Sequence, residues 1–169
     1  MLEEKPPFLY NLPVDDTFRI FVEQLREGKT TSLKESINTS FLGISDANLK
    51  YSNPVELMGT AYLAEDHLMI RLSMTTKAMM TCTICNEWTE VPVTVPSFYL
   101  SVPIEEIKGG IYNLEKEVRE AILLETPRFA ECHGGECPSR NAFKQYFKNR
   151  DEDGDAISPF ESLDPKKFN

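Results

Sequence analysis

Residues 55–80, VELMGTAYLAEDHLMIRLSMTTKAMM, contain two consecutive runs in which apolar or small residues occupy every second position. A period of two is typical of strands with one buried face, because successive side chains of a strand point to opposite sides. Glu65 and Asp66 separate the runs where a turn is needed, so the pattern predicts a long antiparallel hairpin. Gly59 indicates a bulge or a close approach of two backbones. The alternating positions are Val55, Leu57, Gly59, Ala61 and Leu63, then Leu68, Ile70, Leu72, Met74, Thr76, Ala78 and Met80.

Two further strands are predicted, one before and one after the hairpin in the sequence. The first covers residues 33–41, in which Leu33, Ile37 and Phe41 share one alternating register with polar residues between them. The second follows residues 82–85. In it, valine occupies every second position, and prolines lie among the residues between and after the valines. Because proline lacks the N–H that a central strand donates, its prolines favour an edge position. The residues of this strand are Val91, Val93 and Val95, with Pro92 and Pro96 between and after them.

One helix is predicted near each end of the domain. Residues 14–25 carry apolar side chains at helical spacing, and residues 114–125 carry a second apolar stripe with Asn113 as the expected N-cap. The fold class is therefore α+β: an antiparallel sheet of about four to six strands around the central hairpin, packed by an N-terminal and a C-terminal helix. The stripes are Val14, Phe18, Phe21, Val22 and Leu25, then Leu114, Val118, Ala121, Ile122 and Glu125, widened by Leu123 and Leu124.

The length of 169 residues favours a single domain with a sizeable core. We assign residues 1–150 to this domain. Residues 151–169 are expected to form a flexible acidic tail, because residues 151–165 contain six acids and no basic residue. The tail carries a Pro-Phe-x-x-Leu element that begins at Pro159.

Charge and apolar content exclude several classes of protein. Asp and Glu number 27 against 18 Lys and Arg, and the net charge of −9 argues against coating nucleic acid by bulk charge. No apolar run approaches the ~20 residues of a membrane span. Residues 1–8 are acidic and proline-rich, unlike a signal peptide. A cytoplasmic protein without a membrane partner is expected.

Catalytic motifs are absent from the sequence. Histidine occurs only at His67 and His133, and there is no glycine-rich phosphate loop, nucleophile elbow or dinucleotide-binding fingerprint. We therefore expect a protein that is not an enzyme and has no small-molecule substrate.

The four cysteines form two pairs, CTIC at residues 82–85 and CHGGEC at residues 132–137. A CxxC turn between two strands is a knuckle that directs two thiolates at one point, and the glycines of the second pair allow it to fold around the same ion. Four such ligands close a tetrahedral structural site with no open position for substrate. The sequence thus predicts a zinc site, with His133 as an alternative to Cys132, formed by Cys82, Cys85, Cys132 and Cys137.

Three other interpretations of the cysteines stay open. A redox CxxC usually precedes a helix, whose N-terminus lowers the thiol pKa, whereas valine-rich sequence follows Cys85. Structural disulfides are uncommon in the cytoplasm. The third interpretation is that the thiols are unliganded and serve as small apolar residues.

Five short segments occur in a fixed order between residues 55 and 163: MGTAY at 58–62, CTIC at 82–85, EVREAILLETP at 117–127, Cys132 with Cys137, and SPFESL at 158–163. In these segments and their order the sequence resembles the YceD-like family, the large ribosomal RNA subunit accumulation proteins. The family often has Arg where this chain has Ile84 and Asn where it has Ser158. The resemblance implies a non-enzymatic role in processing or accumulation of large-subunit (23S) ribosomal RNA and in ribosome biogenesis, without catalytic residues.

A basic segment offers a place for RNA on this acidic chain. Residues 139–150, SRNAFKQYFKNR, contain four basic residues, three aromatic residues and no acid. If the segment is helical, its basic side chains face phosphate or its rings stack on unpaired bases. The alternative is an ordinary amphipathic helix whose rings pack on the core. The predicted RNA-binding residues are Arg140, Lys144, Lys148 and Arg150.

The expected partner is large-subunit ribosomal RNA or its precursor particle, together with ribosomal or assembly proteins. Two other functions compete with this one. A zinc-stabilised protein–protein adaptor would contact partners through a sheet edge or the Pro159-Phe160 element. A thiol oxidoreductase would rest only on the CxxC motif.

Overall fold

The computed structural model describes residues 16–143, and it has the predicted α+β class, with antiparallel sheets and few helices. Several predictions fall on residues outside this range. They concern the first residues of the N-terminal helix, the acidic tail at residues 151–169, and the RNA-binding candidates Lys144, Lys148 and Arg150.

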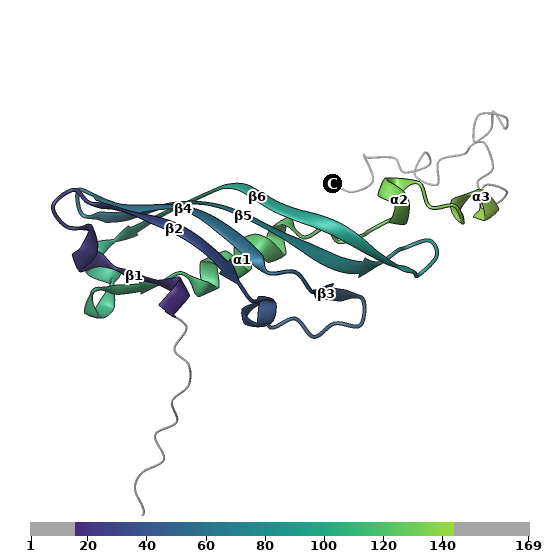
Figure 1. The fold of residues 1–169 in the computed structure, drawn as a ribbon, viewed down its shortest axis with the longest axis horizontal. Coiled ribbons are helices and arrows are strands. Elements are labelled where there is room, and N and C mark those ends of the chain that lie inside the picture. The colour runs from purple at the N-terminus through teal and green to yellow at the C-terminus, as the bar shows by residue number, and fades with distance from the viewer. Residues whose placement is uncertain (1–15, 144–169) are drawn as a thin grey trace, which may run out of the picture.

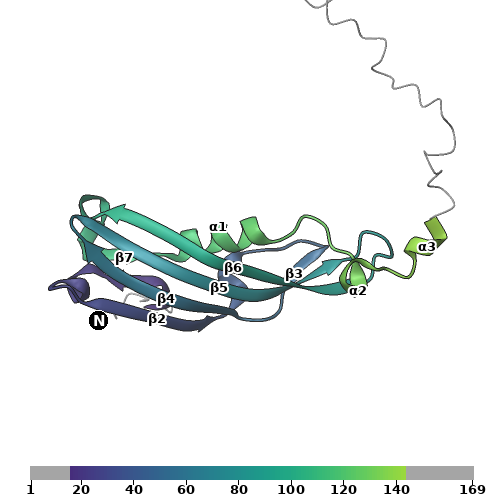
Figure 2. The same cartoon turned by 90° about the horizontal axis from the view of Figure 1, so that it is seen from above.

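The larger sheet has five strands, all paired antiparallel. Strand β4 (Val55–Ala64) lies between β2 (Thr30–Ile37) and β5 (His67–Thr81). The short β3 (Leu49–Tyr51) pairs with the far part of β5 on the same side as β4, and β6 (Trp88–Pro103) pairs with its other side. Figure 2 shows the long strands side by side along the molecule. Within residues 16–143, β6 is therefore an edge strand, which suits its prolines.

The β4–β5 hairpin is the centre of this sheet. Its register runs from Glu56 opposite Thr75 to the turn, where Glu65 has a φ of 52°. A Cβ atom placed on Gly59 would lie 2.0 Å from the carbonyl oxygen of Arg71. Close approach of the two backbones therefore explains this glycine, and the bulge of the sheet lies elsewhere, between β5 and β6.

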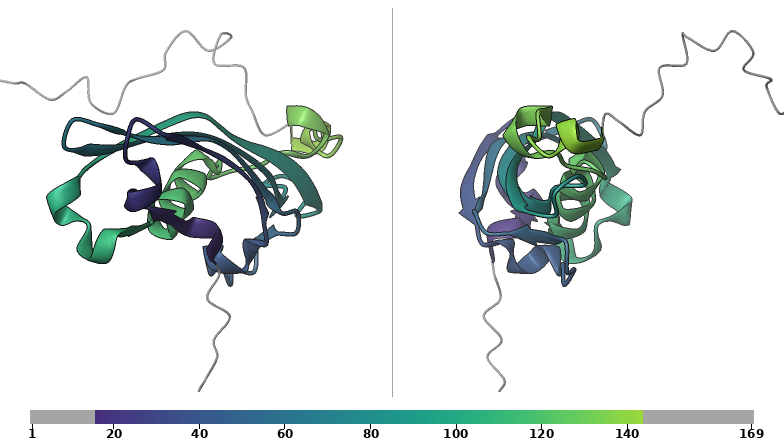
Figure 3. Two further views of the ribbon diagram at one scale, coloured as in Figure 1. Left: turned by 60° about the vertical axis from the view of Figure 1, so that its left-hand side comes forward. Right: turned by 90° about the vertical axis from the view of Figure 1, so that its right-hand side faces the viewer.

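The buried side chains of β4, β5 and β6 occupy alternating positions and line the concave face of the sheet. In β5, for example, Leu68 and Ile70 are buried while their neighbours are more exposed. Helix α1 (Glu115–Glu125) packs on this face through the buried Val118 and Ile122, and the sheet curls around it (Figure 3). Removing this apolar surface from water is the main stabilising contribution, at about 25 cal/mol per Å².

The start of α1 is close to its prediction, but its apolar face is narrower. The helix begins one residue later than predicted, so Leu114 and not Asn113 occupies the N-cap position. The side-chain oxygen of Asn113 still accepts a hydrogen bond from the N–H of Glu115 at 3.0 Å. Leu124 is 84% exposed, so the prediction that it widens the apolar side is wrong. Leu124 follows Ile122 by two residues. Because each residue of a helix advances by about 100°, its side chain points away from Ile122 and from the sheet.

The prediction of a helix over residues 14–25 is wrong for the described part of that range. Phe18, Ile20 and Val22 are all buried, a period of two that suits an extended chain. The pairing partner of this segment lies far along the chain, where no local pattern reveals it. The segment forms η1 (Asp16–Phe18), β1 (Arg19–Phe21) and η2 (Val22–Leu25), and β1 pairs antiparallel with β7 (Ile111–Asn113).

The strand predicted over residues 33–41 begins and ends earlier than expected. After β2 ends at Ile37, the side chain of Asn38 accepts the N–H of Ser40 at 2.9 Å and caps the short helix η3 (Thr39–Leu42). Phe41 therefore leaves the sheet and packs against Phe18, with ring centres 4.9 Å apart. The asparagine cap overrides the alternating pattern at this point.

Four short helices complete the described part of the chain. The helices η4 (Ile104–Glu106) and η5 (Lys108–Gly110) connect β6 to β7. At the opposite end of the molecule, α2 (Cys132–Gly135) and α3 (Arg140–Phe143) follow α1 (Figure 1). Among the helices of residues 16–143, none has the length and apolarity that crossing a membrane requires.

Candidate metal centre

The first cysteine pair lies in the tight connection between β5 and β6. The N–H of Cys82 donates to the carbonyl of Glu87 at 2.8 Å, and the N–H of Asn86 donates back to the carbonyl of Cys82 at 2.9 Å. Asn86 has a φ of 62°, which lets the chain reverse within a few residues. This turn connects two strands, so no helix begins at Cys85.

The second pair is held beside this turn by backbone and side-chain hydrogen bonds. Ala130 forms a parallel bridge with Cys82, and its carbonyl accepts the N–H and the hydroxyl of Thr83 at 2.9 and 3.2 Å. After Cys132, three consecutive residues, His133 to Gly135, have positive φ values of 56°, 65° and 101°. This left-handed turn lets the chain fold back within five residues, with glycine at two of the three positions.

The four thiol sulfurs meet at one point. All four Sγ atoms lie within 4.8 Å of one another, no disulfide joins them, and the Sγ atoms of Cys85 and Cys132 are 3.8 Å apart. Four sulfurs placed about 2.3 Å from a zinc ion in a tetrahedron stand about 3.8 Å apart. The spacing and the soft thiol donor set therefore fit a tetrahedral zinc site.

The surroundings of Cys82 favour a thiolate. Its side chain is 0% exposed, and its sulfur accepts the N–H groups of Cys132 and Ile84, each at 3.4 Å. The hydrogen bond from Cys132, opposed by burial, lowers the pKa of Cys82 to about 6. Burial raises the pKa of the Cys132 thiol well above its usual range. Sharing one cation between the sulfurs would relieve this conflict, because metal binding stabilises the deprotonated form.

A clamp of two charged residues supports the second pair. Both guanidinium nitrogens Nε and Nη2 of Arg140 contact the carboxylate of Glu131, with Nε at 2.9 Å from Oε1. The same carboxylate accepts the N–H of Cys137 at 3.0 Å. The hydrogen bonds from Arg140, and to a smaller extent the one from the N–H of Cys137, lower the pKa of Glu131 to about 2. The Glu131–Arg140 clamp thus fixes the backbone at Cys137, the last of the four cysteines.

The structure brings the four predicted cysteines together and leaves His133 out. His133 is exposed, and the cluster among the described residues consists of cysteines alone, so the geometry favours Cys132 over His133 as a ligand. Arg140 lies beside the cluster, bound to Glu131, and its contact with RNA stays a prediction. Sequence reasoning missed Glu131 and Thr83, whose only signal is that each adjoins a cysteine.

No family model, curated protein or solved structure matches this chain.

Proposed function

We propose that Cys82, Cys85, Cys132 and Cys137 bind a structural zinc ion. The proposal rests on the mutual Sγ distances within 4.8 Å and on the burial of three of the four thiols. Four thiolates leave zinc no open position, and zinc held in this way contributes folding free energy rather than catalysis.

The same geometry argues against a thiol oxidoreductase. A redox CxxC needs one sulfur that a disulfide substrate can reach. Cys82 is fully buried, and Cys85 leads into a turn and a strand instead of a helix N-terminus. The thiol with the lowered pKa, Cys82, is therefore out of reach of a disulfide substrate, and the partly exposed Cys85 has no helix dipole to activate it.

For the protein as a whole, we propose a non-enzymatic role in the accumulation of large-subunit ribosomal RNA and in ribosome biogenesis. Its basis is the resemblance to the YceD-like family together with one observation, the meeting of two cysteine pairs that are separated by 46 intervening residues in sequence. The family-like segment at residues 117–127 contains most of α1 and leads to the second pair. The expected partners are ribosomal RNA or its precursor particle, with ribosomal or assembly proteins.

Sedimentation of cell extract tests this role. We expect the chain to migrate with precursors of the large ribosomal subunit and to leave those fractions after RNase treatment. A chain that stays in the light fractions, with and without RNase, would contradict the role.

A zinc-stabilised protein–protein adaptor is the second candidate. Two apolar side chains close to the metal centre in sequence are largely exposed, Leu124 at 84% and Phe129 at 78%. Exposed apolar groups favour contact with another protein. A complex that withstands RNase treatment is the result that would favour the adaptor over the ribosomal role.

A further inference from the structure

The face of the larger sheet that points away from α1, called here the convex face, is open. The strand register assigns to it the positions that alternate with the buried ones. Helix α1 and the β1–β7 pair lie on the opposite side (Figures 1 and 3), and no described helix covers the central part of the convex face. This surface is therefore available for binding.

The convex face is cationic although the chain carries a net charge of −9. Its four basic residues outnumber its two carboxylates: Glu90 pairs with Lys77 at 2.7 Å, and Glu56 accepts the hydroxyl of Ser36 at 2.6 Å. A local cationic surface on an acidic protein directs a polyanion to that surface. The outward-pointing basic residues are Lys34, Lys50, Arg71 and Lys77, according to their strand partners.

Two of these cations lie against exposed aromatic rings. The Nζ atom of Lys50 is 4.6 Å from the centre of the Trp88 ring. The guanidinium of Arg71 is 4.9 Å from the centre of the Tyr99 ring and donates to its hydroxyl at 3.0 Å. Trp88 is 42% and Tyr99 61% exposed. Exposed rings beside cations are the arrangement on which nucleic-acid bases stack while their phosphates are neutralised.

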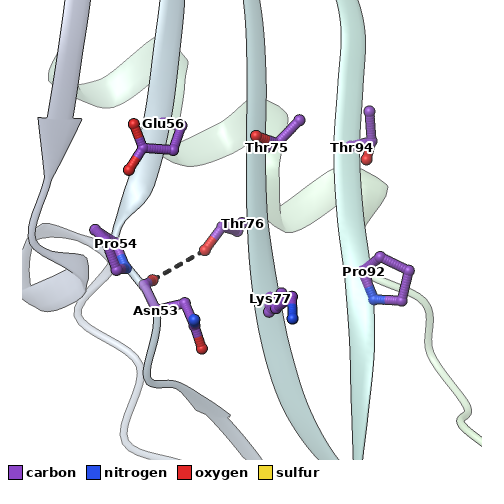
Figure 4. A pocket seen from close by; sticks show the side chains of 8 residues that line it. All are labelled: Asn53, Pro54, Glu56, Thr75, Thr76, Lys77, Pro92 and Thr94. Carbon is purple, nitrogen blue, oxygen red and sulfur yellow. Dashed lines mark hydrogen bonds between the residues drawn. The ribbon is translucent and has the colours of Figure 1, made fainter.

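Two hollows lie on the same face. The larger, about 310 Å³, crosses β4, β5 and β6, and Figure 4 shows Glu56, Thr75 and Thr94 in one row across these strands. The second, about 230 Å³, lies at the bulge of β5 and β6 and includes Arg71 and Tyr99. The hydroxyl and carboxylate groups of the larger hollow offer hydrogen-bond partners to the edge of an unpaired base.

We infer that the convex face binds single-stranded RNA, with Trp88 and Tyr99 as stacking platforms and the four outward cations as phosphate contacts. The choice of RNA rests on the proposed ribosomal role. A single strand is favoured because the bases of a duplex are stacked on each other and do not reach exposed rings. A protein partner is disfavoured, because the cores of protein interfaces are depleted in charged residues, whereas cations are spread over this face.

Binding of the full chain to a labelled oligouridine RNA of about twelve nucleotides tests this inference. Tyr99→Leu and Trp88→Leu are each expected to weaken binding by roughly 5- to 100-fold, the usual effect of losing one stacked base. The double variant Lys34→Gln/Arg71→Gln is expected to lower the slope of log affinity against log salt by about 0.7 per lost contact.

Matched variants away from the convex face serve as controls. Lys116→Gln removes an exposed cation of α1, and Phe129→Leu removes an exposed ring near the metal centre. Both are expected to bind the oligouridine as the native chain does. Unchanged melting temperatures of all variants verify that the fold is intact, since every changed residue is at least partly exposed. Native-like affinity of the Tyr99, Trp88 and double variants, or no binding by the native chain, would overturn the inference.

Sedimentation of the same variants separates this inference from the proposed function. Loss of both oligouridine binding and migration with ribosomal precursors supports the convex face as the contact in cells. Variants that lose oligouridine binding but still migrate with precursors would overturn the convex face as that contact and indicate a protein partner. A native chain that binds oligouridine through this face but never migrates with precursors would support the site and contradict the ribosomal role.

Discussion

The central hairpin and the end of the molecule that carries the four cysteines differ in what holds them together. The main core joins side chains from the long strands, η2, η3 and α1 in one apolar cluster. The end that carries the cysteines, residues 82–87 and 130–140, is called here the metal end. It has a separate buried group made of Cys82, Cys132 and Cys137, with only Ile84 and Cys85 partly buried against it. Apolar burial therefore stabilises the first region, whereas the second has almost no apolar core and depends on its thiols.

Removal of the metal is expected to produce the largest difference in stability between the metal end and the hairpin. In small zinc domains the metal contributes about 10–16 kcal/mol of apparent binding free energy, and on the proposed zinc site only the metal end would depend on it directly. After treatment with a chelator, we expect the amides of residues 82–87 and 130–137 to lose protection from hydrogen exchange, while those of the β4–β5 hairpin keep it. Added zinc should restore the lost protection. Equal loss in both regions would show that the two are one cooperative unit.

A core substitution in the hairpin should have the opposite effect, lowering the stability of the main core without changing the metal end. Leu68 is fully buried, and replacing a buried leucine by alanine costs about 2–5 kcal/mol. Leu68→Ala is expected to lower the free energy of unfolding by this amount in denaturant titration while the zinc content per chain stays the same. Leu124→Ala, at an exposed position, should change stability by no more than about 0.5 kcal/mol. Equal effects of the two variants would contradict the described core.

Gly59→Ala tests the close approach inside the hairpin. The added Cβ atom would meet the backbone oxygen of Arg71 at 2.0 Å, so β4 and β5 must separate locally. We expect a loss of about 1–3 kcal/mol in the free energy of unfolding, the usual cost of overpacking. The adjacent Thr60→Ala adds no atoms and serves as the control, with a change of about 0.5 kcal/mol or less. A neutral Gly59→Ala would place the strands further apart than described.

The smallest effect is expected from the clamp of the metal end. Arg140→Gln removes the cation bound to Glu131, which in turn holds the N–H of Cys137. Residues that orient metal ligands typically change metal affinity by about 10- to 100-fold, and we expect the lower end of this range for an exposed arginine. Competition with a zinc-binding dye measures the affinity. Arg128→Gln, at an exposed arginine with no ion pair among residues 16–143, should leave it unchanged.

The same contrast explains which parts of the fold could be predicted. The strands β4 and β5 are adjacent in sequence and alternate strictly, so local pattern specified both of them and their turn. The prediction for residues 16–25 failed because the buried residues fit two patterns. Phe18, Val22 and Leu25 have helical spacing, whereas Phe18, Ile20 and Val22 have the period of two of an extended chain. Only its pairing with β7, far along the chain, decides between the two. Likewise the cap at Asn38 ended β2 early, a local hydrogen bond that hydrophobic periodicity does not register.

The cysteines of the candidate site could be predicted from the sequence, whereas the residues that hold them in place could not. Cysteine is rare enough that CTIC and CHGGEC attract attention by spacing alone. Glu131 and Thr83 are common residue types, and their roles depend on how the segment after α1 lies beside the β5–β6 turn. The convex face could not be predicted for the same reason, since its four cations come from three strands, β2, β3 and β5, and gather only when the register is known.

The metal content of the native protein decides whether the four cysteines bind zinc. Protein purified without chelator and analysed for elements should contain about one zinc per chain, with its four thiols protected from a thiol reagent until the metal is removed. Far less than one equivalent of zinc, together with four thiols that react freely in the folded protein, would contradict the proposed metal centre and favour unliganded cysteines.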